Sequence, residues 1–271
     1  MRPSSSTVAV VSAPEREDVA ELQRYGDIVV VGGGCYGSYY VRQLRRARDA
    51  GALTWERLVV VDRDPACQVA GDAEFAKDLT LVTRDWTLFF GEYLGAAALR
   101  PREEVAGDAI VPSPLMPHLM AQWVVSRARA RWPGRPLRLM PLDGALDVPW
   151  QRAGNDGTHY VSFATWECPI NCVEPRTCPH TRGPRAWSLP PTVRAFVETE
   201  RLRGRRLDGP AIFHCAHRAF GVGMFDVAAV LEADTLVAAV AEGRQAEILL
   251  GTVSHCHGAL TVLELAAPGS D

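Results

Sequence analysis

Three cysteines and a histidine lie within 13 residues of one proline-rich segment, Cys168-Pro-Ile-Asn-Cys172-Val-Glu-Pro-Arg-Thr-Cys178-Pro-His180. Cysteine thiolates select soft or borderline metals, chiefly zinc, or iron–sulfur clusters. The prolines stiffen the segment, which reduces the entropy lost when ligands converge. One metal centre would be zinc, bound by Cys168, Cys172, Cys178 and His180. The other would be an iron–sulfur cluster, bound by the three cysteines and a fourth, either Cys215 or Cys256.

The spacing of this segment does not decide between the two centres. It matches neither the ferredoxin run nor a standard zinc ribbon, although the two Cys-Pro pairs favour the cluster. A third alternative involves no metal. The cysteines would then be small buried hydrophobic residues or a regulatory thiol pair.

Two further groups combine histidine with cysteine, His214-Cys215-Ala216-His217 and His255-Cys256-His257-Gly258, and they hold four of the seven histidines. Each lies at the end of an expected strand or in a turn, where functional sites are usually built. Strand alternation places the His255 and His257 side chains on one side and Cys256 on the other. Histidine titrates near neutral pH. The candidates for acid–base or nucleophilic chemistry are therefore His214, Cys215, His217, His255, Cys256 and His257.

A glycine-rich turn, Gly32-Gly33-Gly34-Cys35-Tyr36-Gly37, follows an apolar run and precedes an expected helix. This is the G-x-G-x-x-G pattern in the context it requires. The first glycine permits a tight turn, the second lets the backbone approach a pyrophosphate, and the third lets helix and strand pack closely. The N-terminus of the helix offers N–H groups to the phosphates. The expected contacts are Gly32, Gly34, Cys35, Tyr36 and Gly37.

The second apolar run ends at Asp62, whose carboxylate can accept hydrogen bonds from ribose hydroxyls and so favours NAD. The neighbouring Arg63 could instead accept the extra phosphate of NADP. Residues 27–62 resemble the NAD(P)-binding Rossmann superfamily, closest to oxidoreductases and to the nucleotide-sensing domains that regulate potassium transport. The resemblance implies that Gly32, Gly34, Gly37 and Asp62 contact the cofactor. It continues only as a pattern over residues 63–131.

Alternating strands and helices must position these groups. Apolar runs predict strands at 28–31, 57–61, 79–82 and 109–111, with helices at 37–50, 86–94 and 118–131 between and after them. A short helix is expected at 14–25. The later part predicts strands at 211–215, 248–253 and 259–265, and a helix at 225–241. The expected fold is α/β, a Rossmann-like doubly wound parallel sheet followed by a smaller α+β domain with a Cys/Pro-rich loop.

Changes in composition divide the chain into four expected parts. These are an N-terminal arm and short helix (1–26), a Rossmann nucleotide-binding domain (27–132), a linker rich in Pro and Gly (133–158) and a Cys/His-containing α+β domain (159–271). His118 would start a helix at the carboxyl end of the fourth strand. Because ligands bind at that edge of such sheets, His118 is a further active-site candidate.

The 271 residues carry a formal net charge of -3, which argues against nucleic acid as the main partner. No apolar run approaches the ~20 residues of a membrane span, and Val8 to Val11 is too short for a signal peptide. The expected location is the cytoplasm. Seven cysteines there indicate metal or redox chemistry rather than disulfides.

These patterns favour an NAD(P)-binding redox enzyme with a cysteine-ligated iron–sulfur cluster or zinc, and a redox protein as a further partner. The alternative is a nucleotide-sensing regulatory or assembly protein with a structural zinc site. A third possibility is a transferase that uses S-adenosylmethionine on a Rossmann-like sheet. The sequence leaves the substrate, the reaction direction and the oligomeric state open.

Overall fold

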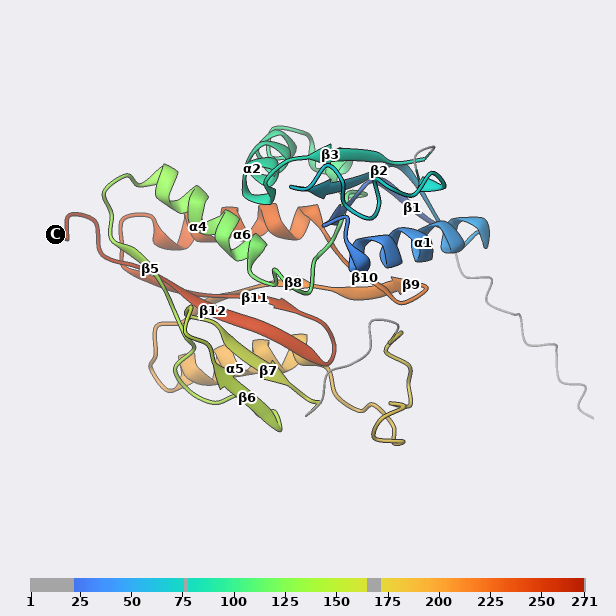
Figure 1. Ribbon diagram of the computed structural model, residues 1–271. Helices are drawn as coiled ribbons and strands as arrows, with labels where there is room; N and C mark the ends of the chain where they lie inside the picture. Colours follow the sequence, from blue (N-terminus) through green and yellow to red (C-terminus); the bar gives the residue numbers. More distant parts are fainter. Residues whose placement is uncertain (1–21, 76–77, 165–171, 271) are drawn as a thin grey trace, which may run out of the picture.

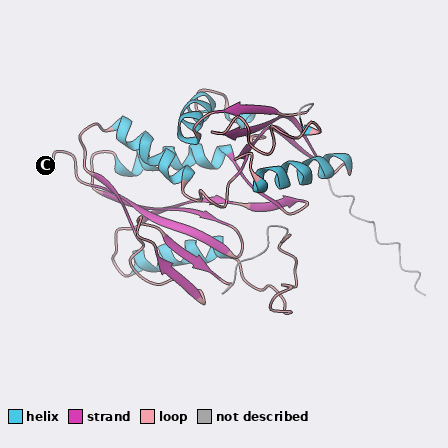
Figure 2. Ribbon diagram, viewed as in Figure 1, coloured by secondary structure: helices cyan, strands magenta, loops and turns pink. Residues whose placement is uncertain are grey.

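A computed structural model describes residues 22–75, 78–164 and 172–270. This part of the chain is an α/β structure with two mixed β-sheets (Figures 1 and 2). The α/β class predicted from the sequence is therefore confirmed. The prediction that the first sheet is purely parallel is wrong, because strands from the C-terminal half join it in antiparallel orientation.

The first sheet contains four parallel strands and a hairpin at one edge. Its strand order is β3 (Thr80–Thr83), β2 (Leu53–Asp62), β1 (Gln23–Val31), β4 (Ala109–Val111), β10 (Val222–Asp226) and β9 (Ala216–Ala219). β1 runs parallel to β2 and β4, and β2 runs parallel to β3. β10 is antiparallel to β4 and to β9.

The second sheet is built from the C-terminal half. Its strand order is β6 (Trp150–Ala153), β7 (His159–Ser162), β12 (His257–Leu265), β11 (Ala246–Val253) and β8 (Asp208–His214), with β5 (Leu137–Met140) also paired to β12. Only the β8–β11 pair is parallel. The carboxyl ends of β8 and β11 therefore meet at one edge.

The helices form layers outside and between the sheets (Figure 1). The helices are α1 (Cys35–Asp49), α2 (Trp86–Ala97), α3 (Arg102–Val105), α4 (Leu119–Arg131), α5 (Leu189–Leu202) and α6 (Val227–Ala241). α1 packs on one face of the first sheet, and α5 packs on the outer face of the second. One core joins both inner sheet faces to α2, α4 and α6.

The apolar run Ile28–Val31 shows how sequence determines this layering. Ile28 and Val30 face the core beneath α1, whereas Val29 and Val31 face the core shared with the second sheet. A strand that is buried on both faces reads as a continuous apolar run rather than an alternating one. The same logic placed β2 and β4 correctly.

Several elements differ from the expectations. Residues 23–25 belong to β1 rather than to a helix, and residues 14–21 lie outside the described part. Residues 133–158, expected to be a linker, include β5 and β6 of the second sheet. Helix α5 was not predicted, although Pro190 and Pro191 occupy positions in its first turn where proline is favoured. In the described part of the chain, no helix is long and apolar enough to cross a membrane.

Candidate functional site

The glycine-rich turn between β1 and α1 has the geometry that its glycines predict. Gly32 adopts a φ of 88°, which favours glycine, and its N–H donates to Val61 O at 2.8 Å. A Cβ at Gly37 would lie 1.8 Å from the Gly32 carbonyl oxygen, so the helix can approach only without a side chain there. A Cβ at Gly34 would meet nothing within 4 Å. Space is therefore open beside the exposed second glycine.

The Asp62 carboxylate braces this turn. Its Oδ2 accepts the Gly33 N–H at 2.6 Å, and its Oδ1 accepts the Asp64 N–H at 2.9 Å. A carboxylate offers about four acceptor sites, so two bonds leave capacity for ribose hydroxyls. The Arg63 guanidinium lies over the Trp86 ring at 5.3 Å, beside the turn. Cys35 is exposed and Tyr36 is half-buried in the first turn of α1.

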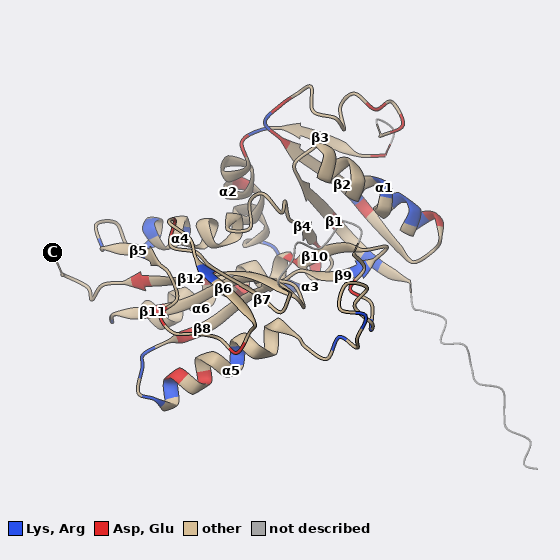
Figure 3. Cartoon of the chain, turned by 60° about the horizontal axis from the view of Figure 1, so that its bottom comes forward, with Lys and Arg blue, Asp and Glu red and all other residues tan. Residues whose placement is uncertain are grey.

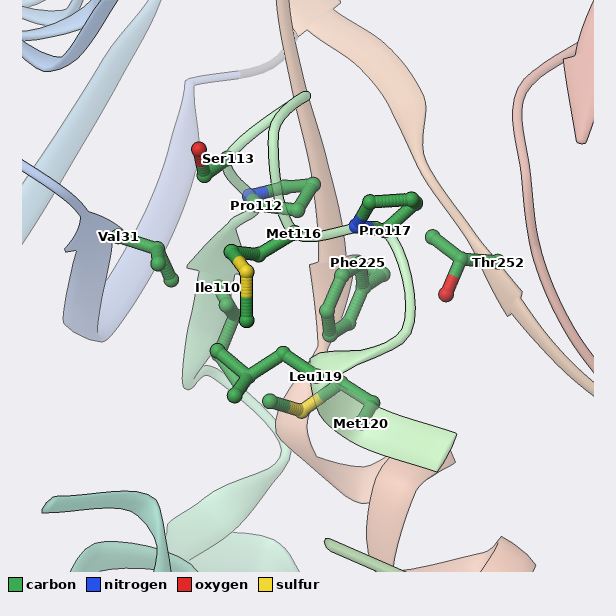
Figure 4. Close-up of a pocket in the computed structure, with 10 residues that line it drawn as sticks. All are labelled: Val31, Ile110, Pro112, Ser113, Met116, Pro117, Leu119, Met120, Phe225 and Thr252. Carbon is green, nitrogen blue, oxygen red and sulfur yellow. The ribbon is translucent and has the colours of Figure 1, made fainter. Parts of the chain in front are cut away.

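A small pocket lies where β1 and β4 end (Figure 4). Its wall includes Val31 and Ile110 from the first sheet, the loop from Pro112 to Pro117, and Thr252 from the second sheet. The space is about 10 Å³, room for about one water molecule. The edge of the first sheet at which nucleotides bind in α/β proteins thus contacts the second sheet directly.

The β9–β10 hairpin extends past the end of β4 at this edge. Phe225 and Asp226 pair with β4, whereas Gly223 lies beyond that pairing and next to β9. A Cβ at Gly223 would lie 2.7 Å from Cys215 Sγ and 2.9 Å from His217 Cδ2. The missing side chain makes room for both groups. Cys215 and His217 therefore stand side by side beyond the carboxyl end of β4.

The cysteine-rich segment packs against this hairpin. A Cβ at Gly221 would lie 3.0 Å from Val173 Cγ1, and the His217 ring bonds to the Cys172 carbonyl group. The carboxylate of Glu174, only 7% exposed, acts electrostatically on the buried thiols and imidazoles around it. We call this group the Cys/His cluster and define it as Glu174, Arg185, His214, Cys215, His217, His255, Cys256 and His257.

His255 and Cys256, the members of the cluster in the β11–β12 turn, contact the segment before α5. Ser188 Oγ lies 2.9 Å from His255 Nδ1, and the His255 ring meets His214 edge-to-face at 4.9 Å. The Trp187 indole N–H donates to Cys256 Sγ at 3.2 Å. His257 Nδ1 lies 2.9 Å from Ser162 Oγ on the neighbouring strand β7. Residues 255 and 256 form a bend, so strand alternation does not set the partners of these side chains.

Burial controls the protonation of the cluster. Burial, followed by the negative charge of Glu174, raises the pKa of Cys215 to about 12. Burial also lowers the pKa of His214, His217 and His257. At neutral pH the three imidazoles are therefore neutral and the Cys215 thiol is protonated. Neutral imidazole can accept a proton or coordinate a metal.

The helix that follows the glycine-rich turn packs against the hairpin that carries His217. The α1 helix packs against β9 and β10, and Tyr40 of α1 contacts the core beneath them. Burial raises the pKa of Tyr40, and Cys215 raises it further. The Cys215 thiol therefore acts electrostatically on a residue of the helix that begins at the glycine-rich turn.

A family model described as "Uncharacterized protein, C-terminal domain" (AF_1314_C) matches residues 120–266, more than half of the chain. The chain belongs to this family. No curated protein and no solved structure matches the chain. The region that defines the AF_1314_C family contains the whole Cys/His cluster, but it begins after the glycine-rich turn.

The expected metal ligands of this AF_1314_C family member are only partly visible. Cys168 lies outside the described residues. Among the residues that the structure does describe, no three His, Cys, Asp or Glu side chains are arranged to hold a metal ion. Cys178 lies in a tight turn, and hydrogen bonds from the Thr181 backbone, the Thr181 hydroxyl and the His180 backbone lower the pKa of its thiol.

The structure unites groups that the sequence left separate. All six predicted catalytic candidates belong to one cluster, and the segment that carries Cys172 covers it. Glu174 was not predicted as a charged member of the cluster. Glu174 adopts a φ of 49°, a left-handed conformation that is uncommon outside glycine and often marks functional sites. No sequence pattern indicates that the Glu174 side chain is buried.

His118, the remaining candidate, lies at the start of α4. Its Nε2 lies 3.1 Å from Thr158 Oγ1 and 3.3 Å from the Tyr160 hydroxyl. Burial lowers the pKa of His118, and the nearby Asp156 opposes that shift. These contacts join α4 to the β6–β7 hairpin.

Proposed function

We propose that this AF_1314_C family member is an NAD(P)-binding redox protein whose first sheet is Rossmann-like. One observation carries the proposal. The β9–β10 hairpin brings Cys215 and His217 past the carboxyl end of β4, next to the helix that begins at the glycine-rich turn. In a sheet with the order β3-β2-β1-β4, a dinucleotide crosses that edge from the turn toward the strand beyond β4.

The residues of the turn have distinct parts in this proposal. The N–H groups at the start of α1 bind the pyrophosphate, and the open space beside Gly34 lets it approach. Asp62 accepts the ribose hydroxyls, and Arg63 is placed to take the extra phosphate of NADP. The nicotinamide ring, when bound, accepts or donates a hydride. In this proposal, neutral His217 would hold or release the accompanying proton.

A cysteine-ligated metal centre is the second part of the proposal. Cys178 receives hydrogen bonds from backbone N–H groups and Cys256 receives one from Trp187, as thiolates bound to metals commonly do. The centre would use Cys172, Cys178 and His180 with Cys168, or a fourth cysteine in place of His180. Iron–sulfur and zinc remain the two alternatives. An iron–sulfur cluster would pass single electrons, whereas a zinc ion would fix the conformation of the loop or polarise a substrate.

Nucleotide binding is tested by titrating the purified protein with NADH and NADPH and following the fluorescence of the nucleotide. We expect saturable binding, tighter for NADH, followed by NADH oxidation when an electron acceptor is added. Binding without oxidation by any acceptor would instead favour the nucleotide-sensing alternative. No binding of either nucleotide would refute the proposal.

The metal centre is tested by purification without oxygen, a visible spectrum and metal analysis. Broad absorbance near ~400 nm with about four irons per chain would identify an iron–sulfur cluster. A colourless protein with one zinc would identify the other centre. Cys172→Ser should abolish metal binding, whereas the matched control Cys35→Ser, an exposed cysteine at the glycine turn, should retain it. Full metal content in Cys172→Ser contradicts the ligand assignment.

A further inference from the structure

Helix α2 lacks the charged outer side that a surface helix normally has. Glu92 is the only charged residue among its 12, and Glu92 already pairs with Arg84. Helix α1, by contrast, is rich in arginine, and its Arg42 and Arg46 are exposed. Figure 3 shows this difference between the two helices. A surface helix usually carries charged and polar residues opposite its core side, whereas a helix that is apolar all round is buried. The composition of α2 is therefore that of a covered helix.

The outer side of α2 is nevertheless uncovered in the described part of the chain. Leu88 in its first turn is 60% exposed, and Leu99, just after its end, is 89% exposed. These two residues are about three helical turns apart, so they lie on the same side. Between them, a Cβ at Gly91 or Gly95 would meet no atom within 4 Å. We call these four residues the α2 face, an apolar surface of the kind that marks an interaction site.

A hollow of about 450 Å³ lies beside this face. Ala98 and Arg100, the neighbours of Leu99 in the sequence, line the hollow, whereas Leu99 itself projects into solvent. Val105 and Leu231 supply part of an apolar wall. A two-fold interface uses the same patch on both copies. A projecting side chain next to a hollow can therefore fill the hollow of a second copy.

The charges around the hollow complement themselves. Two of its arginines form ion pairs within the chain, Arg100 with Asp108 and Arg127 with Asp234. Arg102 and Glu232 also line the hollow, and neither has an ion-pair partner among the described residues. Arg102 follows Leu99 by three positions, so it would reach the hollow of a second copy together with Leu99. One cation and one anion on the same patch can pair twice across a two-fold axis, whereas a patch of one sign would repel its copy.

We propose that two copies of this chain form a two-fold dimer through the α2 face, with Leu99 of each copy in the hollow of its partner. Arg102 then pairs with Glu232 of the partner subunit, and the two-fold axis repeats this contact. Removal of the leucines from water drives the association, and the charge pairs fix its orientation. The dimer depends on neither nucleotide nor metal binding, so it goes beyond the proposed function.

Sedimentation equilibrium of the full chain, over a wide range of protein concentrations, measures the association. We expect a dimer whose dissociation constant rises at least tenfold in Leu99→Glu, because a charge would enter the apolar part of the hollow. The matched control Leu202→Glu, which changes a leucine that is 82% exposed at the end of α5, should dimerise normally. A monomer at every concentration overturns the proposal and assigns the α2 face to a different protein. A dimer that is equally tight in Leu99→Glu overturns the assignment of the surface.

Charge reversal tests the two-fold contact, whether or not Leu99→Glu folds by circular dichroism. Arg102→Glu and Glu232→Arg change exposed residues, and each alone should weaken the dimer several-fold because like charges then face each other. The double variant should restore the dissociation constant to within a few fold of normal. If neither single change weakens the dimer, or if the double variant does not restore it, the proposed contact is overturned.

Discussion

Two glycines of the glycine-rich turn should respond in opposite ways to the same substitution. A methyl group at Gly37 would lie 1.8 Å from the Gly32 carbonyl oxygen, whereas one at Gly34 would meet no atom within 4 Å. Gly34 also has a φ of -77°, which alanine adopts without strain. Gly37→Ala therefore perturbs the fold, and Gly34→Ala perturbs only the space into which a pyrophosphate would enter.

The structure gives the size of each effect. In Gly37→Ala the helix and the turn must separate by more than about 1 Å, an overpacking that costs ~1–3 kcal/mol. For a chain of this size the melting temperature should fall by ~2–4 °C per kcal/mol. Gly34→Ala loses only the preference of the N-cap for glycine over alanine, ~0.5–1 kcal/mol. If a phosphate approaches Gly34 within van der Waals contact, the added methyl group should weaken NADH binding at least tenfold, ~1.4 kcal/mol.

The assays are thermal unfolding followed by circular dichroism and NADH titration followed by fluorescence, on both variants and the unaltered protein. We expect Gly37→Ala to be clearly less stable and Gly34→Ala to be close to normal in stability but deficient in NADH binding. NADH affinity in Gly34→Ala within twofold of normal would show that no pyrophosphate lies there. The nucleotide assignment of the turn would then be refuted, even if the protein binds NADH elsewhere.

Three further changes have defined outcomes. Asp62→Asn should weaken NAD binding about tenfold, ~1–2 kcal/mol for a charge-assisted hydrogen bond. Its effect on NADP binding should be smaller. If the ratio of the NAD and NADP dissociation constants does not change, the contact between Asp62 and the ribose is contradicted. Gly223→Ala should destabilise the protein by ~1–3 kcal/mol in urea, because its methyl group meets Cys215 and His217; unchanged stability would contradict their placement. Burial lowers the pKa of His159, so the unfolded state binds more protons and stability should fall as the pH drops below about 6.5. His159→Gln should make that fall less steep without abolishing it, because burial also lowers the pKa of His118, His214, His217 and His257. An unchanged slope would contradict a contribution from His159.

Local patterns predicted the geometry of the glycine-rich turn well, because each part of that argument concerns neighbouring residues. Gly32, Gly34 and Gly37 lie within six positions of one another, and the turn needs only the strands on either side. The buried runs Ile28–Val31 and Leu58–Val61 are also local signals, since a strand buried on both faces is apolar throughout. NAD binding itself stays a prediction.

Other features depend on pairings that are remote in sequence. The β10 strand joins β4 across more than one hundred residues, and nothing in Val222–Asp226 indicates that partner. That pairing makes the first sheet mixed and brings His217 beyond the carboxyl end of β4. The short strands β5 and β6 have no continuous apolar run. β6 is largely exposed, so its sequence does not have to be apolar. Their place in the second sheet follows from tertiary pairing rather than from propensity.

Two ion pairs that each contain a buried carboxylate show how the cluster differs from ordinary structural polarity. Asp108 is only 1% exposed, yet both its oxygens are used: Oδ2 accepts from Arg100 at 2.8 Å, and Oδ1 accepts the Asp27 N–H at 2.9 Å. This pair fixes the start of β4, and each oxygen of the carboxylate has a hydrogen-bond partner. Glu174 and Arg185 are nearly as buried but remain 3.7 Å apart, each with an unpaired atom and with Glu174 in a left-handed backbone conformation. Hydrogen bonds do not offset the free energy that desolvation of Glu174 and Arg185 costs. Core stability therefore does not explain why this pair is buried.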